Sequence, residues 1–286
     1  MIAVFVALAL FLGWVFGELT QFGFAGVAIA AVIAGGMSFT SYYYSDKIVL
    51  SMSRARAADP TIHQRYLNII EGLAIGAGIP KPRAYVIEDP APNAFATGRN
   101  PENAAVAVTT GLLEKMNRVE LEGVIAHEMS HIRNYDILVT TIAVVLAGTV
   151  TLLSDWLLRS LWFGGRRRGR SEGGTPVLAI LALFGLVLAV LAPLISRLMH
   201  AAVSRRREAL ADVSAVEITR YPPGLISALK KLRDDTTVVR TASHATAHLW
   251  IESPLQRTGG GMSAWLNRLF DTHPPLEERI RLLESL

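Results

Sequence analysis

The chain has 286 residues, of which 51% are hydrophobic and 18% are charged, and its formal net charge is +4. This hydrophobic share is high for a water-soluble protein, so the composition favours a membrane protein. The absence of cysteine excludes disulfides, thiolate metal ligands and cysteine nucleophiles. The excess positive charge comes from arginine clusters, which suit a membrane-flanking role as well as a nucleic-acid one; we predict no nucleic-acid partner.

Two apolar runs, residues 2–16 and 22–37, are separated by a short polar turn and predict a transmembrane hairpin within residues 1–44. A cleaved signal peptide is the alternative for the first run. It is disfavoured because no basic segment precedes that run and a second run follows at once. Tyrosines 42–44 resemble an interfacial aromatic belt. The basic residues after them place this end of the hairpin in the cytoplasm by the positive-inside rule: Lys47, Arg54 and Arg56.

Residues 45–136 have the composition of a water-soluble domain. The pattern predicts a helix over 61–77 and short strands over 83–87 and 94–97. Residues 104–109 are small or β-branched and predict another strand. This strand is either an ordinary core strand or a sheet edge that pairs with an extended substrate backbone. In the second case the substrate-binding residues are Ala105, Val106, Ala107 and Val108.

A helix is predicted from residue 118 onward, and it carries the sequence His-Glu-Met-Ser-His at 127–131. Positions four apart lie on one helix face, so His127 and His131 can bind one metal ion. Glu128 is then placed to act as general base toward a water molecule in peptide hydrolysis. The pentapeptide also occurs by chance, so it needs support from the rest of the chain.

Residues 137–203 contain two further apolar runs, which flank a basic, glycine-rich loop over residues 164–174. If both runs span, the loop lies opposite the cytoplasm, in conflict with the positive-inside rule. The segment is therefore either a transmembrane hairpin, which the length of the fourth run favours, or a hairpin packed on the membrane surface or the domain. The loop itself is suited to contact anionic lipid headgroups.

Residues 204–286 are again soluble in character and offer a third metal ligand. Glu208 is the best candidate, and Asp212 lies four residues further on the same helix face, where it can orient a ligand histidine. The alternative for Glu208 is an ordinary ion pair with Arg205 or Arg206. Helices are also predicted over 225–232 and 274–286.

Taken together, these motifs resemble the HtpX family of membrane-embedded zinc metalloproteases. The resemblance rests on five segments that keep their order: Pro92–Gly98, Ala105–Leu113, His127–His131 followed by Asn134 and Asp136, Glu208–Asp212, and Thr272–Arg279. It covers the chain from the N-terminal hairpin to the C-terminus.

The resemblance implies an α+β fold, in which a mostly helical metalloprotease domain with a small β-sheet stands on transmembrane helical hairpins. The soluble domain is then formed by residues 45–136 and 204–286. One zinc ion per chain is held by His127, His131 and Glu208, with Glu128 as base and Asp212 orienting a histidine. Other divalent ions can occupy such sites.

The resemblance also implies a role in membrane-protein quality control and the stress response. Substrates would be misfolded membrane proteins or unfolded polypeptides, cleaved at the cytoplasmic face of a multi-pass protein in the plasma membrane. His273 either donates a hydrogen bond to the oxyanion or belongs to a turn. Asn93 is a candidate for binding the substrate backbone.

Two other functions are compatible with these patterns. One is a prenyl-protein processing peptidase, which shares both metal-binding motifs but, as that class is known, has more spans than the four runs of this chain. The other is a catalytically silent membrane scaffold, which does not require that all four residues of the metal and base positions be kept. The oligomeric state does not follow from the sequence.

Overall fold

The computed structural model describes residues 2–20, 23–142, 205–239, 249–251 and 274–286. The chain divides into two compact units. The described residues of the first unit are 2–20 and 23–44, and the remainder belong to the second unit. Of the predicted hairpin over residues 137–203, residues 137–142 are helical, and the rest, including the basic loop 164–174, lies outside the described residues. His273 also lies outside them.

The first unit contains two helices in a tight hairpin, α1 (Ile2–Thr20) and the start of α2 (Phe24–Met52). They approach each other closely because glycines face glycines: a Cβ atom at Gly13 would lie 2.7 Å from the carbonyl oxygen of Gly26. Gly23 makes the turn with a positive φ of 53°. In the described part of the chain, α2 is the one helix long and apolar enough to cross a membrane.

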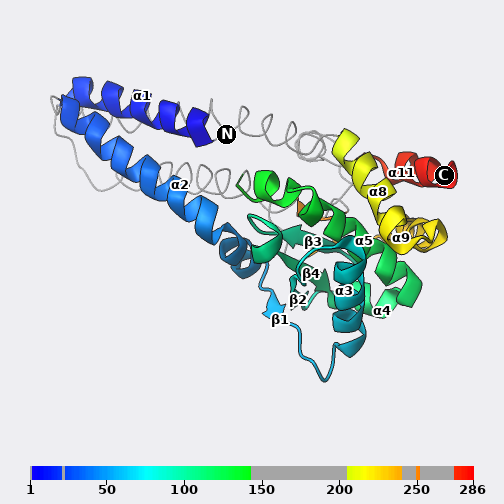
Figure 1. Ribbon diagram of the computed structural model, residues 1–286. Helices are drawn as coiled ribbons and strands as arrows, with labels where there is room; N and C mark the ends of the chain where they lie inside the picture. Colours follow the sequence, from blue (N-terminus) through cyan, green and yellow to red (C-terminus); the bar gives the residue numbers. More distant parts are fainter. Residues whose placement is uncertain (1, 21–22, 143–204, 240–248, 252–273) are drawn as a thin grey trace, which may run out of the picture. The chain divides into compact units, whose positions relative to one another are not determined.

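The second unit contains a four-stranded sheet in the order β1-β2-β4-β3 (Figure 1). Its strands are β1 (Arg56–Ala57), β2 (Arg83–Ile87), β3 (Ala94–Thr97) and β4 (Ala105–Thr109). β4 runs parallel to β2 and antiparallel to β3.

Of the two alternatives for Ala105, Val106, Ala107 and Val108, the sheet edge is wrong and the internal core strand is found. β4 lies between β2 and β3 and pairs with both, so its backbone is already used by its neighbours. The outer strand on this side of the sheet is β3.

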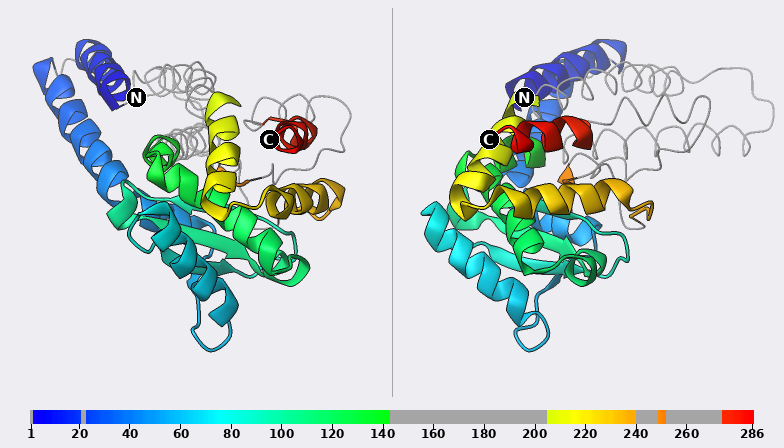
Figure 2. Two further views of the ribbon diagram at one scale, coloured as in Figure 1. Left: turned by 45° about the vertical axis from the view of Figure 1, so that its right-hand side comes forward. Right: turned by 90° about the vertical axis from the view of Figure 1, so that its right-hand side faces the viewer.

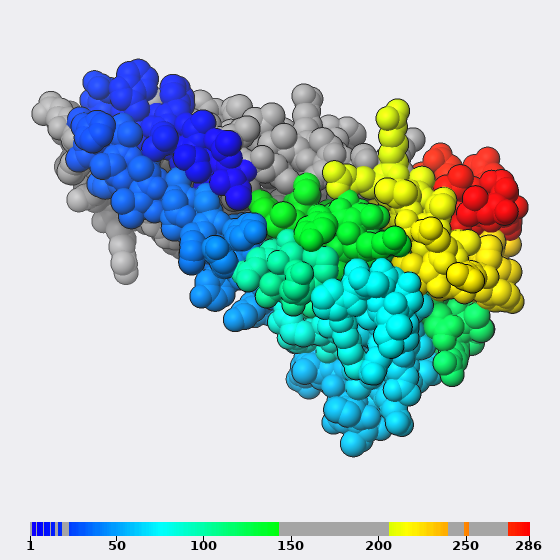
Figure 3. Space-filling model, viewed as in Figure 1, coloured from blue at the N-terminus to red at the C-terminus, as the bar shows by residue number. Residues whose placement is uncertain are grey.

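β3 and β4 are buried on both faces, which explains why they have apolar residues at successive positions. One face, with Val106 and Val108, packs against α3 (Gln64–Ala77) and α5 (Arg118–Arg133). The opposite face, with Phe95 and Ala107, packs against the end of α2 and against Trp250. Figures 2 and 3 show α3 in cyan on the outer side of this unit. The expected α+β architecture, mostly helical with a small sheet, is confirmed.

The metal-motif helix α5 is fixed at its start by a capping box. Asn117 accepts a hydrogen bond from the backbone of Glu120, and the Glu120 carboxylate accepts one from the backbone of Asn117. Glu120 also accepts hydrogen bonds from Ser227 and Lys231 of helix α9 (Pro222–Asp234). The same side chain therefore caps α5 and ties it to a neighbouring helix.

The remaining helices of the second unit are α4 (Thr110–Lys115), α8 (Arg205–Thr219) and α11 (Leu276–Glu284). Helix α5 contacts α3, α8 and α9, so it lies at the centre of the unit. α8 and α11 bring residues from distant parts of the chain to the His-Glu-x-x-His segment of α5.

Candidate metal centre

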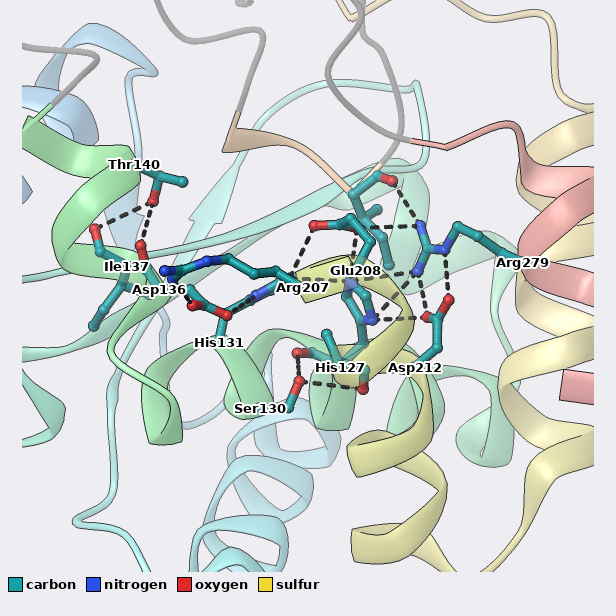
Figure 4. Close-up of polar contacts among 12 residues, drawn as sticks. His127, Ser130, His131, Asp136, Ile137, Thr140, Arg207, Glu208, Asp212 and Arg279 are labelled. Carbon is teal, nitrogen blue, oxygen red and sulfur yellow. Dashed lines mark hydrogen bonds and ion pairs between the residues drawn. The ribbon is translucent and has the colours of Figure 1, made fainter. Parts of the chain in front are cut away.

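His127 and His131 project from one face of α5, as their spacing predicted (Figure 4). Their Nε2 atoms lie 3.2 Å apart, and the ring planes are perpendicular, with centroids separated by 4.8 Å. His127 is fully buried, and the side chain of His131 is 15% exposed. The two imidazoles thus face a common point at the edge of the helix.

Glu208 reaches the same point from α8. Its carboxylate oxygens lie 3.5 Å from Nε2 of His131 and 3.7 Å from Nε2 of His127, and the residue is 1% exposed. Helix α8 approaches α5 closely because Ser130 is small and buried, with its hydroxyl 2.6 Å from the carbonyl oxygen of His127 and 3.2 Å from that of Ala211. His127, His131 and Glu208 each offer one ligand atom, and these three atoms all lie within 4.8 Å of one another, so together they could hold a metal ion.

The far side of each histidine contacts a carboxylate. Nδ1 of His127 lies 3.0 Å from Asp212, and Nδ1 of His131 lies 3.0 Å from Asp136. An ionised carboxylate only accepts hydrogen bonds, so each Nδ1 carries the hydrogen. In the neutral rings both Nε2 lone pairs then face each other beside the Glu208 carboxylate. These electron-rich atoms repel one another, and a cation bound between them would remove the repulsion.

The electrostatics of the two histidines differ. Burial lowers the pKa of His127 to about 4, and the positive charge of Arg279 contributes to this. Burial also acts to lower the pKa of His131, but the hydrogen bond to Asp136 and the charge of Glu208 outweigh it and raise the value to about 9. The surroundings of His131 therefore favour a positive charge, and those of His127 oppose one.

Asp212 is fully buried, and its carboxylate lies beside Nδ1 of His127; that it orients a ligand histidine stays a prediction. Burial raises the pKa of this carboxyl, but the charge of Arg279 and the hydrogen bonds of His127 and Arg279 overcome that effect and hold it at about 2. Asp212 is therefore an anion beside His127 over the whole physiological pH range.

Sequence reasoning missed the role of Arg279, which is 2% exposed on α11. Its Nε and Nη2 atoms donate to the two oxygens of Asp212 at 2.9 and 2.6 Å, and Nη1 donates to the carbonyl oxygen of Ile251 at 3.2 Å. Nη1 also lies 3.9 Å from Glu208. The signal was present, because Arg279 ends one of the segments that carry the family resemblance, but the pattern does not say what it contacts.

Glu128 lies between the two histidines in the sequence and is 2% exposed. Its negative charge acts to raise the pKa values of His131 and Arg279, which shows that the carboxylate belongs to the same electrostatic cluster. The charge of Glu128 also acts to raise the pKa of Tyr66 in α3.

Asn93 is 2% exposed, and its backbone exchanges hydrogen bonds with Thr109 at the start of the β3–β4 pair. Its side chain accepts a hydrogen bond from the backbone of Ala94. The predicted contact of Asn93 with substrate stays a prediction, as does the role of His273, which lies outside the described residues.

Comparison with known proteins gives consistent matches. The model of peptidase family M48 matches residues 60–286. A protease HtpX homologue of Thermoanaerobacter pseudethanolicus is 45% identical over 283 residues, which cover 98% of this chain and 90% of the relative. One from Streptococcus mutans is 47% identical over 264 residues, which cover 91% of this chain and 86% of the relative. The crystal structure of Ste24p from S. mikatae matches 94% of this chain and 67% of its own, with 19% identity and a TM-score of 0.48.

Proposed function

The chain belongs to peptidase family M48 and is a membrane-bound metalloprotease; from this premise we propose that it is a zinc-dependent endopeptidase whose active site is the His127–His131–Glu208 cluster. The single observation that carries the assignment is the convergence of these three ligand atoms, with Glu128 on the same helix. Two histidines and one glutamate are a ligand set of catalytic zinc sites, which keep one position open for water or substrate.

The protein's own residues supply the remaining chemistry. A metal bound here would polarise the substrate carbonyl and make a coordinated water more acidic. Glu128 takes one proton from the attacking water as its oxygen bonds to the carbonyl carbon. Glu128 then gives that proton to the amine nitrogen as the C–N bond breaks, so the base is regenerated. Asp212 holds the His127 ring so that Nε2 faces the ligand position.

The substrates of this proposal are misfolded membrane proteins or unfolded polypeptides, in membrane-protein quality control and the stress response. Because β4 is internal, a substrate backbone that pairs with the sheet on this side has to use β3, the strand that packs against α5. Part of that edge is already in use, since Ile251 donates a backbone hydrogen bond to Ala94 at 2.9 Å.

We further propose that the protein crosses the plasma membrane more than once and that the second unit faces the cytoplasm. The apolar length of α2 and the basic residues Lys47, Arg54 and Arg56 at and beyond its C-terminal end support this orientation.

The experiment that tests the function compares the wild-type chain with Glu128→Gln. Both are purified in detergent and given an unfolded membrane protein, with and without zinc. We expect zinc-dependent cleavage by the wild type and a loss of about 10²–10⁴-fold in the variant, the usual contribution of a general base. Zinc binding should be retained, because Glu128 is not a ligand in this assignment. Glu122→Gln is the matched control, since Glu122 lies on the same helix and pairs with Arg118 at the surface.

Three outcomes contradict the proposal. Equal cleavage by the wild type and Glu128→Gln identifies another base or a contaminating protease. Zinc binding by the wild type without cleavage of any substrate supports the scaffold function instead. Loss of cleavage in Glu122→Gln to the same degree attributes the effect to damage of α5 in general.

A further inference from the structure

Each ligand histidine of the metal centre stands at the end of its own chain of polar contacts. His127 contacts Asp212, and Asp212 is held by Arg279. His131 contacts Asp136, and Oδ1 of Asp136 accepts a hydrogen bond from Nη1 of Arg207. We infer that Asp136 and Arg207 are positioning residues for His131, equivalent to Asp212 and Arg279 for His127; this inference rests on the proposed zinc site.

The backbone around Asp136 is built for this contact. Successive residues of an α-helix are rotated by 100°, so a residue five positions after His131 would point about 140° away from it on an unbroken helix. Helix α5 instead ends at Arg133, and Tyr135 adopts a positive φ of 60°, which is unusual for a non-glycine residue. The chain turns there, and Asp136 comes back to within 3.0 Å of Nδ1 of His131. A bulky residue kept in a strained conformation beside a site points to a positional requirement.

The carboxylate of Asp136 is divided between its two partners. Oδ2 faces His131 and Oδ1 faces Arg207, and the residue is 6% exposed. Arg207 directly precedes Glu208 in α8, so this helix supplies a metal ligand and, from the preceding residue, the cation that holds the carboxylate partner of His131. A shift of α8 would therefore displace Glu208 and loosen His131 together.

The ordinary alternative is an ion pair that fastens the end of α5 to α8. Such a pair would act on stability alone; the side chain of Arg207 is 43% exposed, and that of Asp136 is 8% exposed. That alternative predicts a small loss of stability and no change in zinc affinity. The chain contains a matched control for it, because Arg133 and Glu217 form another pair between α5 and α8, with a separation of 3.8 Å.

The test measures zinc affinity of the full-length protein in detergent by competition with a chelator, for the wild type, Asp136→Asn, Arg207→Gln, the double variant and Glu217→Gln. We expect Asp136→Asn to bind zinc about 10–100-fold more weakly, as loss of the partner of a metal histidine does. Arg207→Gln shows a smaller loss, and Glu217→Gln binds as the wild type does. Urea unfolding of the zinc-free proteins, recorded in parallel, separates affinity from stability.

The double variant decides whether Arg207 acts through Asp136. If it does, adding Arg207→Gln to Asp136→Asn weakens zinc binding no further, and the two losses are not additive. Additive losses refute the role of Arg207. Wild-type affinity in Asp136→Asn, or an equal loss in Glu217→Gln, refutes the positioning of His131. Failure of the wild type to bind zinc refutes the proposed metal centre itself, so the two failures are distinguishable.

Discussion

Replacing Arg279 by methionine should destabilise the second unit strongly. Arg279 is 2% exposed and Asp212 is fully buried, and two hydrogen bonds of 2.9 and 2.6 Å join them. In the variant, the anionic Asp212 keeps its hydrogen bond from Nδ1 of His127 but loses the positive charge of Arg279. Removing one partner of a buried ion pair costs about 3–5 kcal/mol, because a buried charge remains uncompensated. Methionine keeps most of the apolar stem, so a cavity adds little to this loss.

The assay is urea unfolding of the zinc-free, full-length protein in detergent, followed by tryptophan fluorescence. Trp250 reports on this unit, because it is fully buried and packs edge-on against Phe95 with ring centroids 4.9 Å apart. Arg233→Gln is the control, since Arg233 forms a surface pair with Asp234 and should leave the free energy of unfolding nearly unchanged.

A second substitution separates the charge from other effects of the change. Adding Asp212→Asn to Arg279→Met removes the unpaired anion, so the double variant should be more stable than Arg279→Met alone. A loss below about 1 kcal/mol in Arg279→Met, or no recovery in the double variant, would show that Asp212 does not depend on Arg279 for its charge compensation.

Two further predictions concern stability against pH and the orientation in the membrane. Burial acts to raise the pKa of Glu120, but hydrogen bonds from Lys231 and other donors lower it below its usual 4.5. The ionised Glu120 therefore contributes to stability above pH 4.5, and this contribution is lost as the pH falls through the lower pKa of the folded state. The free energy of unfolding of Glu120→Gln, measured against pH, should lack this acid-dependent loss. A pH profile identical to that of the wild type would contradict the prediction. The chain has no cysteine, so Glu88→Cys, at a side chain that is 74% exposed, provides a single label. It should react with a membrane-impermeant maleimide in opened cells only, and labelling of intact cells would place the second unit outside.

The local patterns of the sequence determined most of the metal centre. The four-residue spacing of His127 and His131 puts both rings on one helix face, and Glu208 and Asp212 repeat that spacing on a second helix. The capping box at Asn117 fixes where the first helix begins. Such features depend on residues within one or two turns of each other, so a single sequence contains them.

The order of the strands did not follow from the sequence. Residues 94–97 and 105–109 are both short, apolar and fully buried, and this pattern is the same for an internal strand and for an outer strand that other parts of the chain cover. Which of them lies outside depends on pairing with β2, which is set by the global topology. The sequence therefore left both alternatives open for residues 104–109, and the pairing of the strands decides for the internal one.

The partners of the metal ligands were also decided by the tertiary structure alone. Asp212 and Arg279 are 67 residues apart in the chain, and Asp136 and Arg207 are 71 apart. Neither pair has a helical or strand spacing that a pattern could reveal, because the contacts arise only when α8 packs against α5 and α11 packs against α8 and α9. The sequence by itself determined which side chains can bind a metal ion, through periodicity along single helices. Only the packing of those helices decided which charges hold these side chains in place.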